Sequence, residues 1–503
     1  MNFTQKLLTL TVVAVLGLTA LLLIRSYEGD QGDAGQKLMM YCAAGVKPPV
    51  LKAAKEFEKL YGVKIELQYG GSGTLLNNLQ VAKQGDLYLA ADASFLDIAR
   101  EKGLVKESLP LAEMKPVIAV QKGNPKGIKS LSDLLRKDVR LSLGNPEAAS
   151  IGKLAKHLLS QAGVWEDVKK QVEDRGVFKP TVPEVANDIK IGAVDAGIIW
   201  DATTNQYDSL DSIEIPEFDL AQKMITIGVL NSSQKETLAL RFARYLNSLE
   251  GNAIFNSEGY QAVEGDKWAW MPDLTFFCGS VNRRAVEDLL KEFSEREGLS
   301  INTIYNGCGI LTAQMKTIKL EKGGEGFPDF YMACDRYYLD NVIEMFQEDL
   351  DISDTPIVIA VPEGNPNQVK GIADLTKPGV KVAVGQCDQC TIGALTRTLL
   401  ESEGFDQQIK KNVATETATS SLLVPAVTTK SVDAAFAFYS DTLAEASKVD
   451  SIAIASKKSL AIQPYAIARS SDYKFIGRRL KAAILANKEA FIKAGFNFRA
   501  EQP

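Results

Sequence analysis

The residues with the clearest chemical potential in this sequence are five cysteines in its second half. Of the six cysteines in the chain, only Cys42 lies in the first half. Thiolates are soft ligands that select zinc, copper(I) or iron–sulfur clusters, and Cys-x-x-Cys is a spacing used in zinc sites. If they converge on one place, these thiols predict a thiophilic metal ion or an iron–sulfur cluster bound by Cys278, Cys308, Cys334, Cys387 and Cys390.

Two other interpretations of these cysteines stay open. In an oxidising compartment they would form structural disulfides, with Cys387 bonded to Cys390 and two of the remaining three bonded to each other. The odd number leaves one thiol over in that scheme. The other interpretation is a reversible thiol redox or electron-transfer role for this half of the chain.

Catalytic groups built on histidine cannot be assembled from this sequence. The single histidine, His157, lies in the amphipathic run KLAKHLLSQAG and is expected on a helix surface. Zinc hydrolases and Ser-His-Asp catalysts depend on histidine. Carboxylates such as Glu56 and Glu58 have lysine neighbours, which indicates a solvated helix face. We therefore expect a binding protein and not an enzyme.

An internal repeat supplies the frame that must position the cysteines. The segment that begins at Tyr41 aligns without a gap with the segment that begins at Phe277, so that Ser72 aligns with Cys308. Further along, GDLYLAADASFLD aligns with PDFYMACDRYYLD, and VDAGIIWDATT with VDAAFAFYSDT. Since 503 residues are too many for one hydrophobic core, we expect two modules, at residues 37–267 and 268–503.

Each copy has the pattern of an α/β fold. Short β-branched runs such as VIAVQ (117–121) and VKVAV (380–384) alternate with amphipathic stretches such as VLKAAKEFEKLYG. This alternation predicts parallel sheets covered by helices. Ligands of such sheets bind beyond the carboxyl ends of the strands, which is where the matched loops are expected.

Several motifs of the first copy occur together: CAAG before the first helix, YGGSGTL at 69–75, AADAS at 90–94, GNPEAASIG at 144–152 and RYLNSLEGNAIFNSEGY at 244–260. With them the copy resembles the molybdate-binding family of type II periplasmic binding proteins. The resemblance implies two α/β lobes joined by a hinge, and a small inorganic oxyanion of the molybdate or tungstate type. Amides and a serine hydroxyl at helix N-termini would hold it, at Ala44, Gly45, Gly71, Ser72, Ser150, Ile151 and Trp200.

Two positions depart from the pattern of that family. It usually has a serine where Gly45 supplies only an amide, and a tyrosine where Trp200 supplies only an indole N–H.

In the second copy, the cysteines stand at the loops that hold ligand in the family it resembles. Cys278 lies in the first loop. Cys308 and Cys334 replace Ser72 and Ala91, while Cys387 and Cys390 replace Pro146 and Ala149. The exchange of hydroxyls for thiols predicts a changed class of ligand, with Ser280, Thr391 and Tyr439 as further binding residues.

The N-terminus predicts export. Leu7 to Ile24 carry no charge and are long enough to span a bilayer, and no small-residue cleavage site follows them. We expect a transmembrane anchor and tether over residues 1–36, or a secreted protein if the segment is cleaved. The body would lie on the periplasmic, extracytoplasmic face of the cytoplasmic membrane.

Charge and fold together suggest the partners. The net charge of -6 and the lack of a long basic run exclude nucleic acid. Closure of two lobes would trap the anion or metal, and the permease of an ABC transporter or another membrane complex would accept or sense it.

Overall fold

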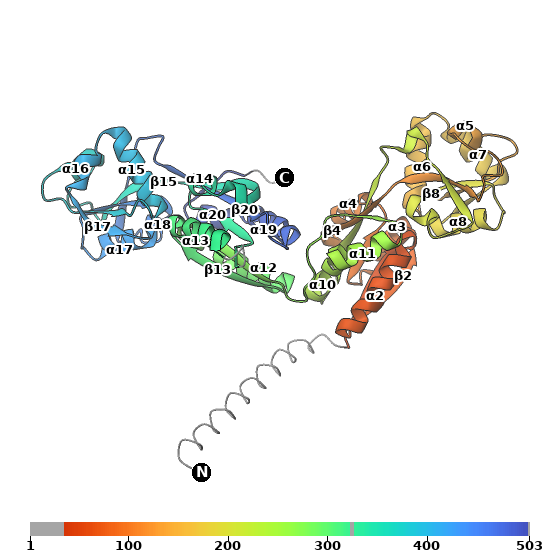
Figure 1. The fold of residues 1–503 in the computed structure, drawn as a ribbon, viewed down its shortest axis with the longest axis horizontal. Helices are drawn as coiled ribbons and strands as arrows, with labels where there is room; N and C mark the ends of the chain where they lie inside the picture. The colour runs from red at the N-terminus through yellow and green to blue at the C-terminus, as the bar shows by residue number, and fades with distance from the viewer. Residues whose placement is uncertain (1–34, 322–325, 501–503) are drawn as a thin grey trace, which may run out of the picture. The chain divides into compact units, whose positions relative to one another are not determined.

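The computed structural model describes residues 35–321 and 326–500, and the chain divides between Trp268 and Ala269 into two α/β units (Figure 1). We call them the first and the second module. The predicted anchor at Leu7 to Ile24 lies outside the described residues and stays a prediction. A search of the described helices finds none with the length and apolar character needed to span a bilayer.

The first lobe of the first module is a six-stranded sheet in the order β11-β4-β10-β3-β1-β2. β1 is parallel to β2 and β3, whereas β10 runs antiparallel to β3 and β4. Its strands are β1 (Lys37–Ala43), β2 (Lys64–Gly70), β3 (Leu87–Ala90), β4 (Val105–Met114), β10 (Lys223–Leu230) and β11 (Gln261–Ala262). Its helices are α2 (Lys47–Tyr61), α3 (Ser72–Ala82), α4 (Ser94–Glu101), α10 (Glu236–Asn247) and α11 (Leu249–Ser257).

The second lobe of this module is a five-stranded sheet in the order β7-β6-β8-β5-β9. Figure 1 shows α6, α7 and α8 gathered around β8. The strands are β5 (Pro116–Gln121), β6 (Leu141–Gly144), β7 (Val177–Lys179), β8 (Ala196–Trp200) and β9 (Leu210–Ile213). The helices are α5 (Leu131–Leu134), α6 (Ser150–Gln161), α7 (Trp165–Arg175), α8 (Val182–Lys190) and α9 (Asp201–Thr204).

The second module repeats this arrangement with one continuous sheet of ten strands. The path β13-β12-β14-β20-β15-β18-β16-β17 is joined by β19 and β21, which both pair with β15. Its strands are β12 (Asp273–Gly279), β13 (Ser300–Asn306), β14 (Phe330–Met332), β15 (Phe346–Pro362), β16 (Val382–Gly385), β17 (Val413–Thr417), β18 (Ala434–Phe438), β19 (Val449–Ala453), β20 (Leu460–Ala468) and β21 (Asn497–Phe498). Its helices are α12 (Arg283–Glu297), α13 (Cys308–Glu321), α14 (Arg336–Asp340), α15 (Thr391–Glu403), α16 (Asp406–Lys410), α17 (Leu423–Thr428), α18 (Tyr439–Leu443), α19 (Lys474–Ala486) and α20 (Lys488–Lys493).

The sheets are mixed, and the prediction of purely parallel sheets was wrong. The 17-residue strand β15 pairs antiparallel with β20 in its first part and with β18 and β19 in its last part. It therefore belongs to both lobes. In the first module the corresponding segment forms two strands, β4 and β5, which are separated by Lys115. A strand that passes between lobes runs against the parallel set, and periodicity along a single segment does not reveal that direction.

The first helix of each module shows why the two copies fold alike. α2 and α12 end at Gly62 and Gly298, whose φ angles of 68° and 65° lie in the left-handed region that glycine adopts without strain. Each helix buries a phenylalanine at the same position, Phe57 or Phe293.

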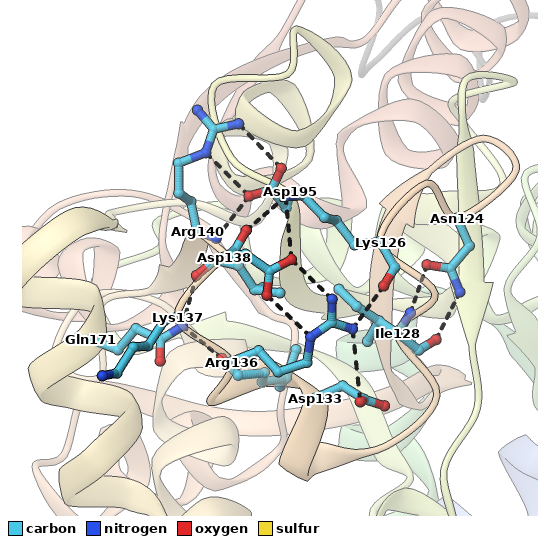
Figure 2. A network of polar contacts seen from close by, with 12 residues as sticks. Asn124, Lys126, Ile128, Asp133, Arg136, Lys137, Asp138, Arg140, Gln171 and Asp195 are labelled. Atoms are coloured by element: carbon cyan, nitrogen blue, oxygen red, sulfur yellow. Dashed lines mark hydrogen bonds and ion pairs between the residues drawn. The ribbon is translucent and has the colours of Figure 1, made fainter.

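Polar contacts hold the edge of the second lobe in the first module (Figure 2). Arg136 Nη2 lies 2.9 Å from Asp138 Oδ2, and Arg140 Nε lies 3.1 Å from Asp195 Oδ2. Exposed ion pairs of this kind contribute little stability. The buried Gln171 matters more, because its amide donates to the carbonyl oxygens of Leu134 and Val139, which the connecting loop would otherwise leave without partners.

We predict that Phe57→Ala destabilises the first module by about 3–5 kcal/mol. The ring is fully buried against Phe242, Tyr245 and Trp268, with centroid distances of 5.1, 5.3 and 6.2 Å. Denaturant unfolding followed by tryptophan fluorescence measures the change in the free energy of unfolding. Leu60→Ala on the same helix is the control, since Leu60 is 59% exposed and should cost less than about 0.5 kcal/mol. Equal effects of the two substitutions would contradict the assignment of Phe57 to the core.

Candidate ligand sites between the lobes

In the first module, loops from both lobes meet at one small cavity. The first lobe supplies the loops after β1, β2 and β3, and the second lobe supplies those after β6, β7 and β8. Three helices begin there, because α3 starts at Ser72, α6 at Ser150 and α8 at Val182. The cavity is lined by Ala43, Ala44, Gly45, Gly70, Gly71, Ser72, Ala91, Ala149, Ser150, Ile151, Thr181, Val182 and Trp200.

All seven residues predicted for the first site line this cavity. The sequence argument missed Thr181 and Val182 from the loop after β7. A signal for them was present, since Thr-Val-Pro at 181–183 places a potential cap and a proline at a helix start. Without the fold, nothing indicated that this helix opens toward the same cavity.

Backbone contacts close the two lobes on each other. The Gly73 N–H donates to the Ala148 carbonyl oxygen over 2.9 Å, and Ser72 Oγ lies 3.5 Å from Ser150 Oγ. A Cβ atom on Gly71 would lie only 2.3 Å from the Ala148 oxygen and 2.4 Å from the Pro180 oxygen. The enclosed space is about 10 Å³, close to the least that holds one water molecule. A ligand larger than water must therefore hold the lobes further apart than they lie here.

The lining of the cavity carries no charged side chain. Its polarity comes from hydroxyls, amides and the positive ends of α3, α6 and α8. Ser72 Oγ accepts a hydrogen bond from the Ala91 N–H over 3.2 Å and donates its own hydrogen to Ser150 Oγ over 3.5 Å. Such a set of donors can hold an anion without a cationic side chain.

A tyrosine from the end of the module ties the first ligand loop in place. The hydroxyl of Tyr260 donates to the Gly45 carbonyl oxygen and accepts from Gln206 Nε2 over 3.2 Å. Burial raises the pKa of Tyr260, so the hydroxyl keeps its proton and remains a donor.

The matching loops of the second module bring two thiols into contact. Cys308 Sγ lies 2.9 Å from Cys334 Sγ, and the Cys334 N–H donates to Cys308 Sγ over 3.0 Å. This second bond reproduces the one between Ala91 and Ser72. Cys278, in the preceding strand, is fully buried, and burial raises its pKa well above the ordinary value.

The two cysteines of the Cys-x-x-Cys motif lie in different surroundings. Cys390 precedes α15 and is buried, and burial raises its pKa to about 12, with nearby Cys308 and Asp441 adding to the effect. Cys387 is only half-buried and lines a groove on the second lobe with Arg397 and Lys410. All six cysteines are free, so the predicted disulfide between Cys387 and Cys390 is not formed in this structure.

The remaining predicted residues of the second module lie in different environments. Thr391 is buried, with its hydroxyl beside the thiols of Cys308 and Cys334, whereas Ser280 is half-buried. Tyr439 is 37% exposed, and the residue that aligns with Trp200 is the buried Phe438. Sequence reasoning also missed Asp441 beside Cys390, a carboxyl whose pKa burial raises to about 6.

The predicted five-thiol metal site is not assembled in this structure. Across residues 35–321 and 326–500, no three histidine, cysteine or acidic side chains are grouped closely enough to hold a metal ion. Cys387 lines the groove on the second lobe, and none of the other four cysteines of this module lies there.

Comparison with known proteins finds one match in each of the two modules. Residues 38–261 and residues 274–497 each match the family of bacterial extracellular solute-binding proteins. The chain belongs to this family. The predicted tandem duplication of a binding module is thereby confirmed, and the chain is a solute-binding protein.

Individual relatives are similar to about half of this chain. A protein of Haemophilus influenzae named as a binding protein is 29% identical over 225 residues, which cover 44% of this chain and 90% of that protein. A protein of Bacillus subtilis named as an ABC transporter substrate-binding lipoprotein is 25% identical over 258 residues, 50% of this chain and 97% of its own. The molybdate-binding protein of Mycobacterium tuberculosis is 21% identical over 232 residues, 45% and 85% respectively.

A solved structure about the size of one module also matches. The periplasmic molybdate-binding protein of Azotobacter vinelandii covers 45% of this chain and 100% of that chain, with 16% identity and a TM-score of 0.41.

We predict that Gly71→Ala keeps the first module from closing. The backbone of Gly71 has a φ of −68°, which alanine tolerates, so the effect comes from the clash with carbonyl oxygens of the opposite lobe. The Gly73 amide, which is hydrogen-bonded across the lobes, should exchange its hydrogen at least tenfold faster by NMR or mass spectrometry. Gly371→Ala is the control, because a Cβ there meets nothing within 4 Å. Unchanged exchange at Gly73 would contradict this account of closure.

Proposed function

We propose that the first module captures a small tetrahedral oxyanion of the molybdate or tungstate type outside the cytoplasm and delivers it to the permease of an ABC transporter. The observation that carries this proposal is the convergence of three helix N-termini and two serine hydroxyls on a cavity without charged side chains.

The chemistry of the cavity favours an anion over a cation or a neutral solute. Backbone N–H groups at a helix start have no partner inside the helix and are aimed at whatever lies before it. The oxygens of a tetrahedral oxyanion accept such donors from several directions at once. A cation would need acceptors with negative charge, and the lining of this cavity has no carboxylate.

Capture and release require the lobes to move about the connection between β4 and β5. There the Lys115 N–H donates to Asp201 Oδ1 over 3.1 Å, and the Asp201 N–H donates to the Lys115 oxygen over 2.9 Å. Lys115 Nζ also lies 3.0 Å from Glu214 Oε1 on the returning segment. Because few residues join the lobes, rotation at these positions opens the cavity while both sheets stay intact.

The names of the relatives support this assignment. One is named for molybdate binding and another for a role as the substrate-binding part of an ABC transporter. The donor set of this chain also includes Gly45 and Trp200, because an amide and an indole N–H are donors too.

We predict that Ser72→Ala and Ser150→Ala each weaken oxyanion binding roughly 10- to 100-fold, as expected for a hydrogen bond to a charged group worth about 1.5–3 kcal/mol. Isothermal titration of the full-length protein with molybdate, tungstate, sulfate and phosphate measures the dissociation constants. Ser160→Ala, at an exposed position of the same helix α6, is the matched control. No heat with any of the four anions would overturn the proposal.

A thiophilic metal ion or an iron–sulfur cluster in the second module is the second candidate. The sulfur atoms of Cys308 and Cys334 lie together. Cys390 is near enough for Cys308 to raise the pKa of the Cys390 thiol. Elemental analysis of full-length protein prepared without oxygen or chelators should then find about one equivalent of a soft metal, lost in Cys308→Ser. Metal below 0.1 equivalent would rule this candidate out for the protein as prepared.

A further inference from the structure

The thiols of Cys308 and Cys334 are placed as a reactive pair. Their sulfur atoms are 2.9 Å apart, whereas the atoms of a disulfide bond are about 2.05 Å apart. Both residues lie in loops of one lobe, since Cys308 follows β13 and Cys334 follows β14. A bond between them needs a small shift of two neighbouring loops and no movement of one lobe against the other.

The duplication shows that room for the pair was made by a third substitution. Ser72, Ala91 and Ala43 of the first module align with Cys308, Cys334 and Gly279 of the second. A Cβ atom on Gly279 would lie 2.2 Å from Cys334 Sγ and 2.8 Å from Cys308 Sγ. An alanine at this position, as in the first module, would clash with both sulfurs, so the glycine and the two cysteines fit only together.

The surroundings of the pair divide the two thiols into different roles. Cys308 is the first residue of α13, where the positive end of the helix stabilises a thiolate. The Cys334 N–H also donates to Cys308 Sγ over 3.0 Å, which favours negative charge on that sulfur. Cys308 is therefore the nucleophile and Cys334 the proton carrier.

We propose that Cys308 and Cys334 are a redox-active dithiol of the second module that exchanges with low-molecular-weight disulfides. The Cys308 thiolate attacks one sulfur of the incoming disulfide, whose S–S bond breaks and releases one thiolate. Cys334 then attacks Cys308 Sγ in the mixed disulfide and releases the second thiolate. The proton of Cys334 ends on one leaving thiolate, and the other takes a proton from the solvent, to which Cys308 had given its own. Two protein thiols are thereby oxidised while one disulfide is reduced to two thiols.

Access to the pair depends on separation of the lobes. In the closed module Cys308 is fully buried and Cys334 is 4% exposed. A Cβ on Gly307 would lie 2.4 Å from the Gln389 oxygen of the opposite lobe, which shows how tightly that loop is covered. Opening removes this cover and leaves the two loops of the first lobe in place. The proposal concerns the second module alone and does not depend on anion binding by the first.

The test titrates full-length protein with buffers of oxidised and reduced glutathione, quenches with acid, and counts free thiols by alkylation after denaturation. The wild type should fall from six free thiols to four in the oxidising buffers and return to six in the reducing ones. Mass spectrometry should find one disulfide-linked pair of peptides, with Cys308 and Cys334. Cys308→Ser and Cys334→Ala, which restore the residues of the first module, should each keep all five of their thiols.

Two controls separate this outcome from others. Cys387→Ser removes the half-exposed thiol of the Cys-x-x-Cys motif and should still lose two thiols, and circular dichroism establishes that each variant is folded. Six free thiols at every glutathione ratio would overturn the proposal, and so would a disulfide between Cys387 and Cys390. A bound metal that blocks oxidation until a chelator is added would assign the pair to metal binding instead.

Discussion

The close approach of backbone to backbone across each cleft is the constraint on which the binding sites depend. In both modules the loop that leads into α3 or α13 carries glycines that face carbonyl oxygens of the other lobe. Gly71 faces Ala148 and Pro180, and Gly307 faces Gln389 and Ala418. A side chain on either glycine would hold the lobes apart. Because closure brings helix N-termini together, these glycines decide whether the donors can surround a ligand.

The two modules use one backbone arrangement for different side-chain chemistry. In the first, the hydroxyl of Ser72 accepts the Ala91 N–H, and in the second, the sulfur of Cys308 accepts the Cys334 N–H. The backbone donor is the same, but sulfur is larger and softer than oxygen. The larger atoms fit because Gly279 has no side chain.

This division suggests that the modules do different work in one chain. A cavity lined by neutral donors suits reversible capture of an anion, which fits the solute-binding family to which both halves belong. A buried dithiol suits a group that changes its covalent state when the lobes open. Both proposed functions would use the hinge between two lobes, so duplication of one binding module would supply the scaffold for each.

From the sequence alone, the duplication, the α/β class and the loops that meet at the cavity of the first module could be predicted. Those loops were predictable because Gly-rich turns and helix starts are local features, and the repeat identified them twice. The mixed direction of the sheets was not predictable, since β15 reveals its direction only through its partners β18 and β20.

The fate of the five cysteines was decided by tertiary structure alone. Cys387 and Cys390 are three positions apart in sequence, yet one lies in a groove and the other faces Cys308, whereas Cys308 and Cys334 are in contact across 26 positions. The spacing of two cysteines in the sequence predicts that they are close only when both lie within one turn of a helix or one loop. Which of them meet depends on how neighbouring strands end at the cleft, and that is a property of the folded sheet.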